Sequence, residues 1–125
     1  MNTVLWILQA LLAVAMLGAG AQKLTKTKEQ LMASGQMDWT EDFPEPQIKG
    51  IGTLEVLAAI GLILPALLDI APALVAVAAS GIVLLMLGAT ATHIRRKEPQ
   101  MVIVNLVIAA IALFIAIERF GPHSF

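Results

Sequence analysis

Four long apolar stretches dominate the sequence and decide what kind of fold it can adopt. A bilayer core about 30 Å thick needs about 20 apolar residues in a helix that rises 1.5 Å per residue. Four stretches reach this length, over residues 3–22, 50–68, 71–93 and 100–118. Each is apolar on every side instead of along one stripe, which is typical of membrane-spanning helices. We therefore predict an all-α fold, a single transmembrane four-helix bundle over residues 1–125.

The composition indicates that lipid surrounds most of this chain. Hydrophobic residues make up 58% and charged residues 14% of the 125 residues, whereas soluble domains have about 45–50% and about 25%. A net charge of −1 leaves no basic surface for nucleic acid, so we expect no nucleic-acid partner. Because the chain has no Cys, it cannot by itself build a disulfide, an iron–sulfur cluster or a thiolate metal site.

Proline and polar residues separate the predicted spans. Pro65 is expected to end the second span, and Asp69 and Pro72 to lie at the start of the third. Pro99 opens the fourth. The long segment 24–49 carries too many charges to enter lipid and is predicted to be a surface loop.

The first span has a competing interpretation as a cleaved signal peptide. The small residues Ala19-Gly20-Ala21 resemble a cleavage site. However, no Lys or Arg precedes the apolar run, and the run is longer than the usual signal-peptide core of about 7–15 residues. These two features favour a spanning helix.

The basic residues predict how the bundle is oriented. Seven of the eight Lys and Arg lie in or beside the two loops that follow the first and third spans: Lys23, Lys26, Lys28, Lys49, Arg95, Arg96 and Lys97. The side with both termini holds Arg119 alone. By the positive-inside rule, the loops are predicted to be cytoplasmic and both termini periplasmic. The run Arg95-Arg96-Lys97 is predicted to lie against anionic lipid at the membrane surface.

Four polar side chains inside the spans are predicted to share one depth. Lys23 and His93 end the first and third spans, while Glu55 and Asn105 each lie about one turn into the second and fourth. Because successive spans alternate in direction, all four fall in the cytoplasmic half. Small residues share their helix faces and permit close helix packing, so the four side chains are predicted to converge inside the bundle. On the fourth span that face is Asn105, Ala109, Ala112 and Ala116.

Each of these residues also has a simpler interpretation. Lys23 can extend to the headgroups, His93 can lie in the interface, and Asn105 can make one interhelical hydrogen bond. Glu55 can be a solvated residue at a helix start, or a buried acid that is paired with Lys23 or His93 or is kept protonated. Together, the four residues form a cluster that can bind a polar headgroup or quinone carbonyl, or relay a proton.

Metal and haem are not expected at this cluster. Only Glu55 and His93 are good metal ligands, whereas a stable site needs three or four. His93 and His123 are predicted to lie on opposite membrane faces, so they cannot ligate one haem from both sides.

Several motifs resemble the DoxX-like family across nearly the whole chain, apart from residues 26–46. They are Gly20-Ala21-Gln22-Lys23-Leu24, Gly50-Ile51-Gly52-Thr53-Leu54-Glu55 continuing to Pro65, Gly88-Ala89-Thr90-Ala91-Thr92-His93, and Ala112-Leu113-Phe114 through Arg119-Phe120. The resemblance implies a four-span bundle in the bacterial cytoplasmic membrane. The family is named for a small membrane subunit of a thiosulfate:quinone oxidoreductase, and its recurring polar positions match Lys23, Glu55 and His93.

We therefore predict an accessory or binding subunit for a quinone or another lipid-like molecule, or for a partner oxidoreductase. No nucleophile with a base and an orienting group is recognisable, so catalysis by the chain alone is not expected. A second hypothesis is a small proton-coupled transporter that acts as a homo-oligomer. Small multidrug transporters also have four spans and a membrane acid, although theirs lies in the first span. The third is a purely structural membrane assembly protein.

Overall fold

The structure, a computed structural model, describes residues 2–33 and 43–121. Within these ranges all regular elements are helices: α1 (Asn2–Thr25), α2 (Lys28–Ala33), α3 (Glu45–Leu67), α4 (Leu74–Arg95) and α5 (Pro99–Phe120). Every one except the short α2 is long and apolar enough to cross a membrane. The prediction of an all-α transmembrane bundle is confirmed.

Two helix ends differ from the expected ones. α3 begins at Glu45, after Pro44 as N-cap, and continues two residues past Pro65 to Leu67. Pro65 lacks the N–H that would bond to the Gly61 carbonyl, and the helix ends two residues beyond it. α4 begins at Leu74, three residues later than expected, because the connecting turn holds Asp69 and Ala71 at positive φ angles of 53° and 46°.

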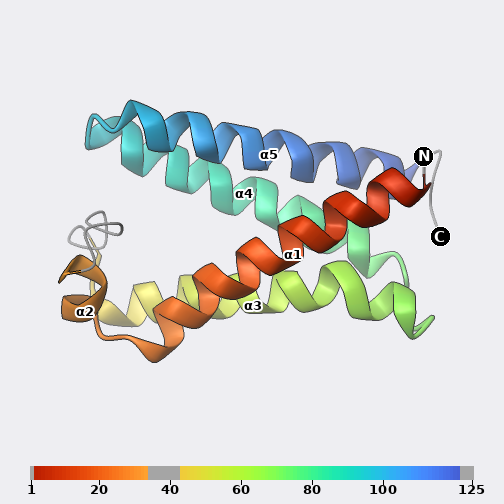
Figure 1. The fold of residues 1–125 in the computed structure, drawn as a ribbon, viewed down its shortest axis with the longest axis horizontal. Coiled ribbons are helices and arrows are strands. Elements are labelled where there is room, and N and C mark those ends of the chain that lie inside the picture. The colour runs from red at the N-terminus through yellow and green to blue at the C-terminus, as the bar shows by residue number, and fades with distance from the viewer. Residues whose placement is uncertain (1, 34–42, 122–125) are drawn as a thin grey trace.

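The four long helices form two antiparallel pairs. α1 packs against α3, α4 packs against α5, and α3 joins the pairs through its contact with α4. Figure 1 shows α1 crossing the bundle from the C-terminal end of α5 to the N-terminal half of α3. Since α1 leans away from α5 along its length, the two pairs are close at one end of the molecule and separated at the other.

Small residues bring the helices of each pair into close contact. A Cβ atom added at Gly20 of α1 would lie 2.7 Å from the carbonyl oxygen of Gly52 on α3, so only glycine fits there. On α5 the predicted inward face, Asn105, Ala109, Ala112 and Ala116, is buried. Large aliphatic side chains such as Leu11 and Val14 instead face outward, where a bilayer would surround them.

Candidate functional site

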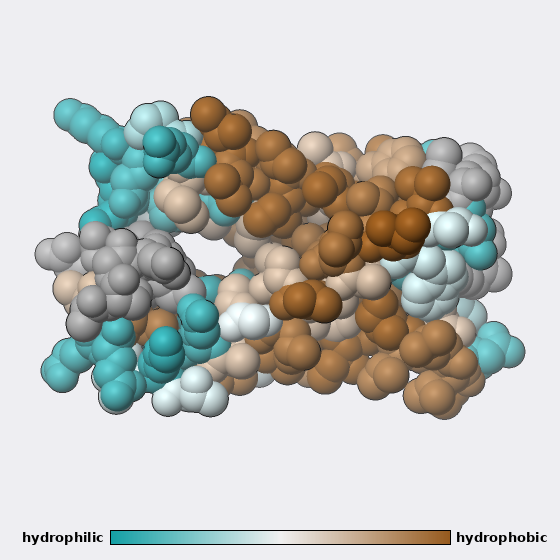
Figure 2. Space-filling view, viewed as in Figure 1, coloured by the Kyte–Doolittle hydropathy of each residue, from teal (hydrophilic) through white to brown (hydrophobic). Residues whose placement is uncertain are grey.

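A cavity lies between the two helix pairs, at the end where they separate. Its volume is about 1150 Å³, and side chains from all four long helices line it. Figure 2 shows it as a hollow between the brown helical surfaces, close to the polar end of the molecule. The four predicted polar residues all line this cavity: Lys23 from α1, Glu55 from α3, His93 from α4 and Asn105 from α5. We call them the polar cluster.

Lys23 and Glu55 form a buried ion pair across the α1–α3 contact. Lys23 Nζ lies 2.8 Å from Glu55 Oε1, and the two side chains are 6% and 4% exposed. The glycine contact helps to place them, because a Cβ atom at Gly52 would lie 2.8 Å from Lys23 Cβ. The interpretation of Glu55 as a solvated helix-start residue is wrong: α3 begins at Glu45, so Glu55 lies almost three turns inside the helix and is buried.

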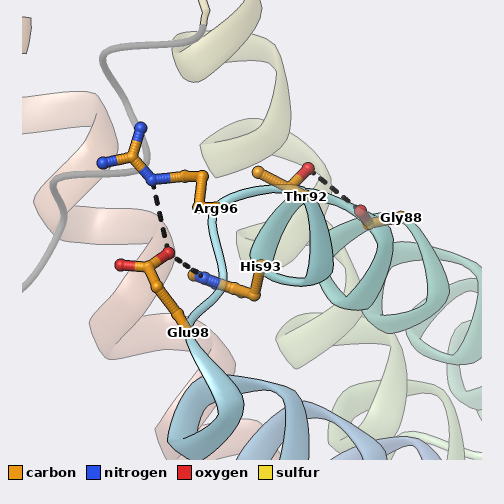
Figure 3. Close-up of polar contacts among 5 residues, drawn as sticks. All are labelled: Gly88, Thr92, His93, Arg96 and Glu98. Carbon is orange, nitrogen blue, oxygen red and sulfur yellow. Dashed lines mark hydrogen bonds and ion pairs between the residues drawn. The ribbon is translucent and has the colours of Figure 1, made fainter.

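His93 connects the cavity with the surface of the α4–α5 turn. Figure 3 shows its ring pointing at Glu98, with Nδ1 2.9 Å from Oε1, while Arg96 Nε lies 3.3 Å from the same oxygen. His93 is buried, whereas the Glu98 side chain is 33% exposed. The nearby Thr92 hydroxyl donates a hydrogen bond to the Gly88 carbonyl, so its proton is already engaged.

Asn105 differs from the other three because its side-chain nitrogen has no hydrogen-bond partner among the described residues. Asn105 lines the cavity and is 6% exposed, and its Nδ2 is fully buried. The simpler interpretation of Asn105, one interhelical hydrogen bond, finds no such bond from Nδ2 in the described part of the chain. Leaving a buried donor unsatisfied costs about 1–3 kcal/mol. A ligand in the cavity with an acceptor oxygen would remove that cost.

A second set of polar residues, which sequence reasoning did not bring together, joins the helices at the other end of the molecule. Arg119 donates from Nε to Gln9 Oε1 and from Nη1 to Asn2 Oδ1, both at 2.8 Å. Gln9 Nε2 donates to the Leu62 carbonyl at 2.8 Å, and the guanidinium lies 5.9 Å from the Trp6 ring centroid. We call Asn2, Trp6, Gln9 and Arg119 the Arg119 cluster. The available signal was that Asn2 and Arg119 lie at the same end of the bundle, one at the start of the first helix and the other at the end of the last.

The predicted membrane-surface residues Arg95, Arg96 and Lys97 lie at the α4–α5 turn. Arg95 and Lys97 are exposed, and Arg96 is half-buried. Lys97 has a positive φ of 59°, which closes the short turn that places Glu98 beside His93. Contact between these residues and lipid stays a prediction. Nowhere in residues 2–33 and 43–121 do three His, Asp or Glu side chains gather as a metal site would need.

The fold and its apolar outer surface define an integral membrane protein built on four spanning helices. A sequence model of the DoxX-like family matches residues 7–115, and the chain therefore belongs to that family. This match includes the whole polar cluster. No curated protein and no solved structure matches the chain.

Proposed function

We propose that this DoxX-like protein binds a lipid-soluble small molecule, such as a quinone, in the cavity between its helix pairs. The unpartnered Nδ2 of Asn105 carries this proposal, because a buried amide donor in an open cavity is suited to an acceptor oxygen such as a quinone carbonyl. Inside the cavity the charges of Lys23 and Glu55 neutralise each other, and Arg95, which also lines it, is exposed at its outer end. The buried part of the lining therefore favours an uncharged ligand headgroup. Apolar side chains make up most of the remaining wall.

The role that follows is that of an accessory subunit. The described residues of the cavity include no nucleophile with a base and an orienting group, so the chemistry would come from a partner oxidoreductase that exchanges electrons with the bound molecule. The exposed apolar sides of the helices can also pack against a partner or against a second copy of this chain.

Native mass spectrometry of the protein extracted in mild detergent tests the proposal. We expect the wild-type protein to retain a lipid or quinone and Asn105→Leu to lose it. Thr90→Val is the control, since Thr90 is a buried polar residue whose hydroxyl donates to the Met86 carbonyl and which does not line the cavity. Equal retention by Asn105→Leu and wild type would contradict the proposal.

Proton-coupled transport is the second candidate, and the His93–Glu98 contact favours it. A buried histidine at the cavity that touches a partly exposed carboxylate offers a route for protons between cavity and water. Proteoliposomes that contain a pH-sensitive dye would report proton uptake with candidate substrates. Uptake that is abolished by His93→Gln would favour transport over simple binding.

We also propose that the protein lies in the bacterial cytoplasmic membrane with both termini in the periplasm. The proposal rests on the basic residues gathered at the end of the molecule that carries α2 and the α4–α5 turn. Single cysteines at two exposed positions, Gln30→Cys in α2 and Asp69→Cys in the α3–α4 turn, test it on this Cys-free background. An impermeant reagent should label only Asp69→Cys in intact cells. Labelling of Gln30→Cys alone would reverse the orientation.

A further inference from the structure

The cavity has a second part, an apolar groove between α3 and α4 that is open to the surrounding lipid. α3 and α4 touch at Gly61 and Ala78, where a Cβ atom on the glycine would lie 2.9 Å from that of the alanine. Toward the polar cluster the two helices separate. The cavity there is lined by Leu57 and Leu84, whose side chains are 58% and 71% exposed. A molecule in the membrane can therefore enter sideways between α3 and α4.

Glycines leave the α4 side of this groove unfilled. A Cβ atom added at Gly81 or Gly88 would meet no described atom within 4 Å, and both residues line the cavity. Gly81 precedes His93 by twelve residues on α4, which corresponds to about 18 Å along the helix axis. The groove is thus long and narrow, and it leads from the polar cluster toward the middle of the bilayer.

The polar cluster suits the headgroup of a single-chain lipid, and the α3–α4 groove suits its hydrocarbon chain. Asn105 Nδ2 is a buried donor without a described partner, so it selects a headgroup with an acceptor oxygen. The buried Lys23–Glu55 ion pair contributes no net charge, and the cationic Arg95, which also lines the cavity, is exposed instead of buried beside Asn105. The buried part of the site therefore disfavours an anionic or cationic headgroup. The groove beyond offers only apolar contacts beside Gly81, and these suit a hydrocarbon chain.

We infer that the site binds an uncharged, single-chain lipid with its acceptor oxygen at Asn105 and its chain in the α3–α4 groove beside Gly81. The inference rests on the proposed function and adds which class of molecule binds, how it is oriented and where it enters. Two sources share this chemistry: a monoacylglycerol, whose oxygen is an ester carbonyl, and a prenylated quinone, whose oxygen is a ring carbonyl.

Gly81→Phe provides the test, because its Cβ would meet no described atom within 4 Å and its phenyl ring would extend into the groove. Gly18→Phe is the matched control: Gly18 also meets no described atom within 4 Å, but it is exposed on α1 and does not line the cavity. Binding to protein in nanodiscs would be measured for an oleoyl monoacylglycerol and a prenylated benzoquinone, each beside a short-chain counterpart with the same headgroup.

We expect Gly81→Phe to weaken binding of a long-chain probe about tenfold or more, with little change for its short-chain counterpart. Gly18→Phe should bind like wild type. Binding of either long-chain probe supports the inference and identifies the source. Equal weakening of long-chain and short-chain probes, or none, would overturn it, while the proposed function survives if Asn105→Leu still removes binding. Failure of wild type to bind any probe would contradict both.

A second measurement does not depend on how Gly81→Phe folds. A monoacylglycerol with a diazirine near the end of its chain, photolysed on the wild-type protein, should label the groove residues Leu54, Leu57, Gly81 and Leu84. Labelling confined to α1 and α5 would place the chain on the opposite side of the cavity and overturn the inference.

Discussion

The two ends of this bundle use buried polar residues in opposite ways. In the Arg119 cluster, donors and acceptors from α1, α3 and α5 meet at 2.8 Å and hold the helix pairs together. In the polar cluster, Lys23 pairs with Glu55 inside one helix pair and His93 contacts Glu98 next to the other, while Asn105 Nδ2 finds no described partner. One end is closed by hydrogen bonds between the pairs, and the other encloses a cavity.

This difference indicates that the Arg119 cluster stabilises the bundle, whereas the polar cluster is suited to bind a ligand. Polar groups inside a membrane cost several kcal/mol when they are unsatisfied, so a bundle normally pairs them. In the Arg119 cluster, Nε and Nη1 of Arg119 and both side-chain polar atoms of Gln9 follow that rule. The polar cluster follows it within each helix pair but not across the gap, which suggests that an external molecule completes it. Substitutions at the two ends should therefore differ in their effect on stability.

The largest loss of stability is expected for Glu55→Gln. Glutamine keeps the shape but leaves the Lys23 ammonium buried without its counter-charge, at a cost of about 3–5 kcal/mol. Unfolding in detergent would measure it. The double variant Lys23→Met with Glu55→Gln should recover most of the loss. Wild-type stability of the single variant would mean that Glu55 is already neutral.

Gly20→Leu should cost about 3 kcal/mol, at the upper end of the range for overpacking, because its side chain would collide with the backbone of α3 at Gly52. Gly18→Leu is the control, with open space around its Cβ position, and should change stability by less than about 0.5 kcal/mol. Thermal melting of both variants would show whether α1 and α3 remain a tight pair beside the cavity. Similar melting temperatures would count against the close contact.

Arg119→Met should destabilise the closed end by about 2 kcal/mol, since it removes two charge-assisted hydrogen bonds and leaves Gln9 Oε1 without its donor. Arg95→Met, an exposed arginine at the other end, is the control and should be nearly neutral. Hydrogen exchange at the start of α1 would locate the loss. If both variants were equally stable, the Arg119 cluster would not hold the pairs together.

Asn105→Leu should have the smallest effect on stability, and it should stabilise the protein instead of destabilising it. Leucine removes a buried donor that has no described partner, so the ligand-free protein should be unchanged or more stable by up to about 1 kcal/mol. Melting of delipidated protein would show this, and added ligand should then stabilise wild type but not the variant. A loss as large as that of Arg119→Met would show that Asn105 has a structural partner.

Much of the fold and part of the site were predictable, because both depend on depth in the membrane. Apolar length located the spans, and alternation of direction placed Lys23, Glu55, His93 and Asn105 in the same half of the bundle, where all four line the cavity. Helical spacing also identified the buried face Asn105, Ala109, Ala112 and Ala116. The helix ends were less predictable. Pro65 lies inside α3, which ends two residues later instead of at the proline.

What the sequence alone determined is which residues share a depth and a helix face, since both follow from the fixed rise and period of a helix. The tertiary structure decided which of them touch. The packing of Gly20 against Gly52 brought Lys23 into contact with Glu55, and the short turn at Lys97 brought Glu98 into contact with His93. The tilt of α1 then closed one end through Arg119 and left Asn105 facing a cavity at the other, because packing angles depend on side chains from all four helices together.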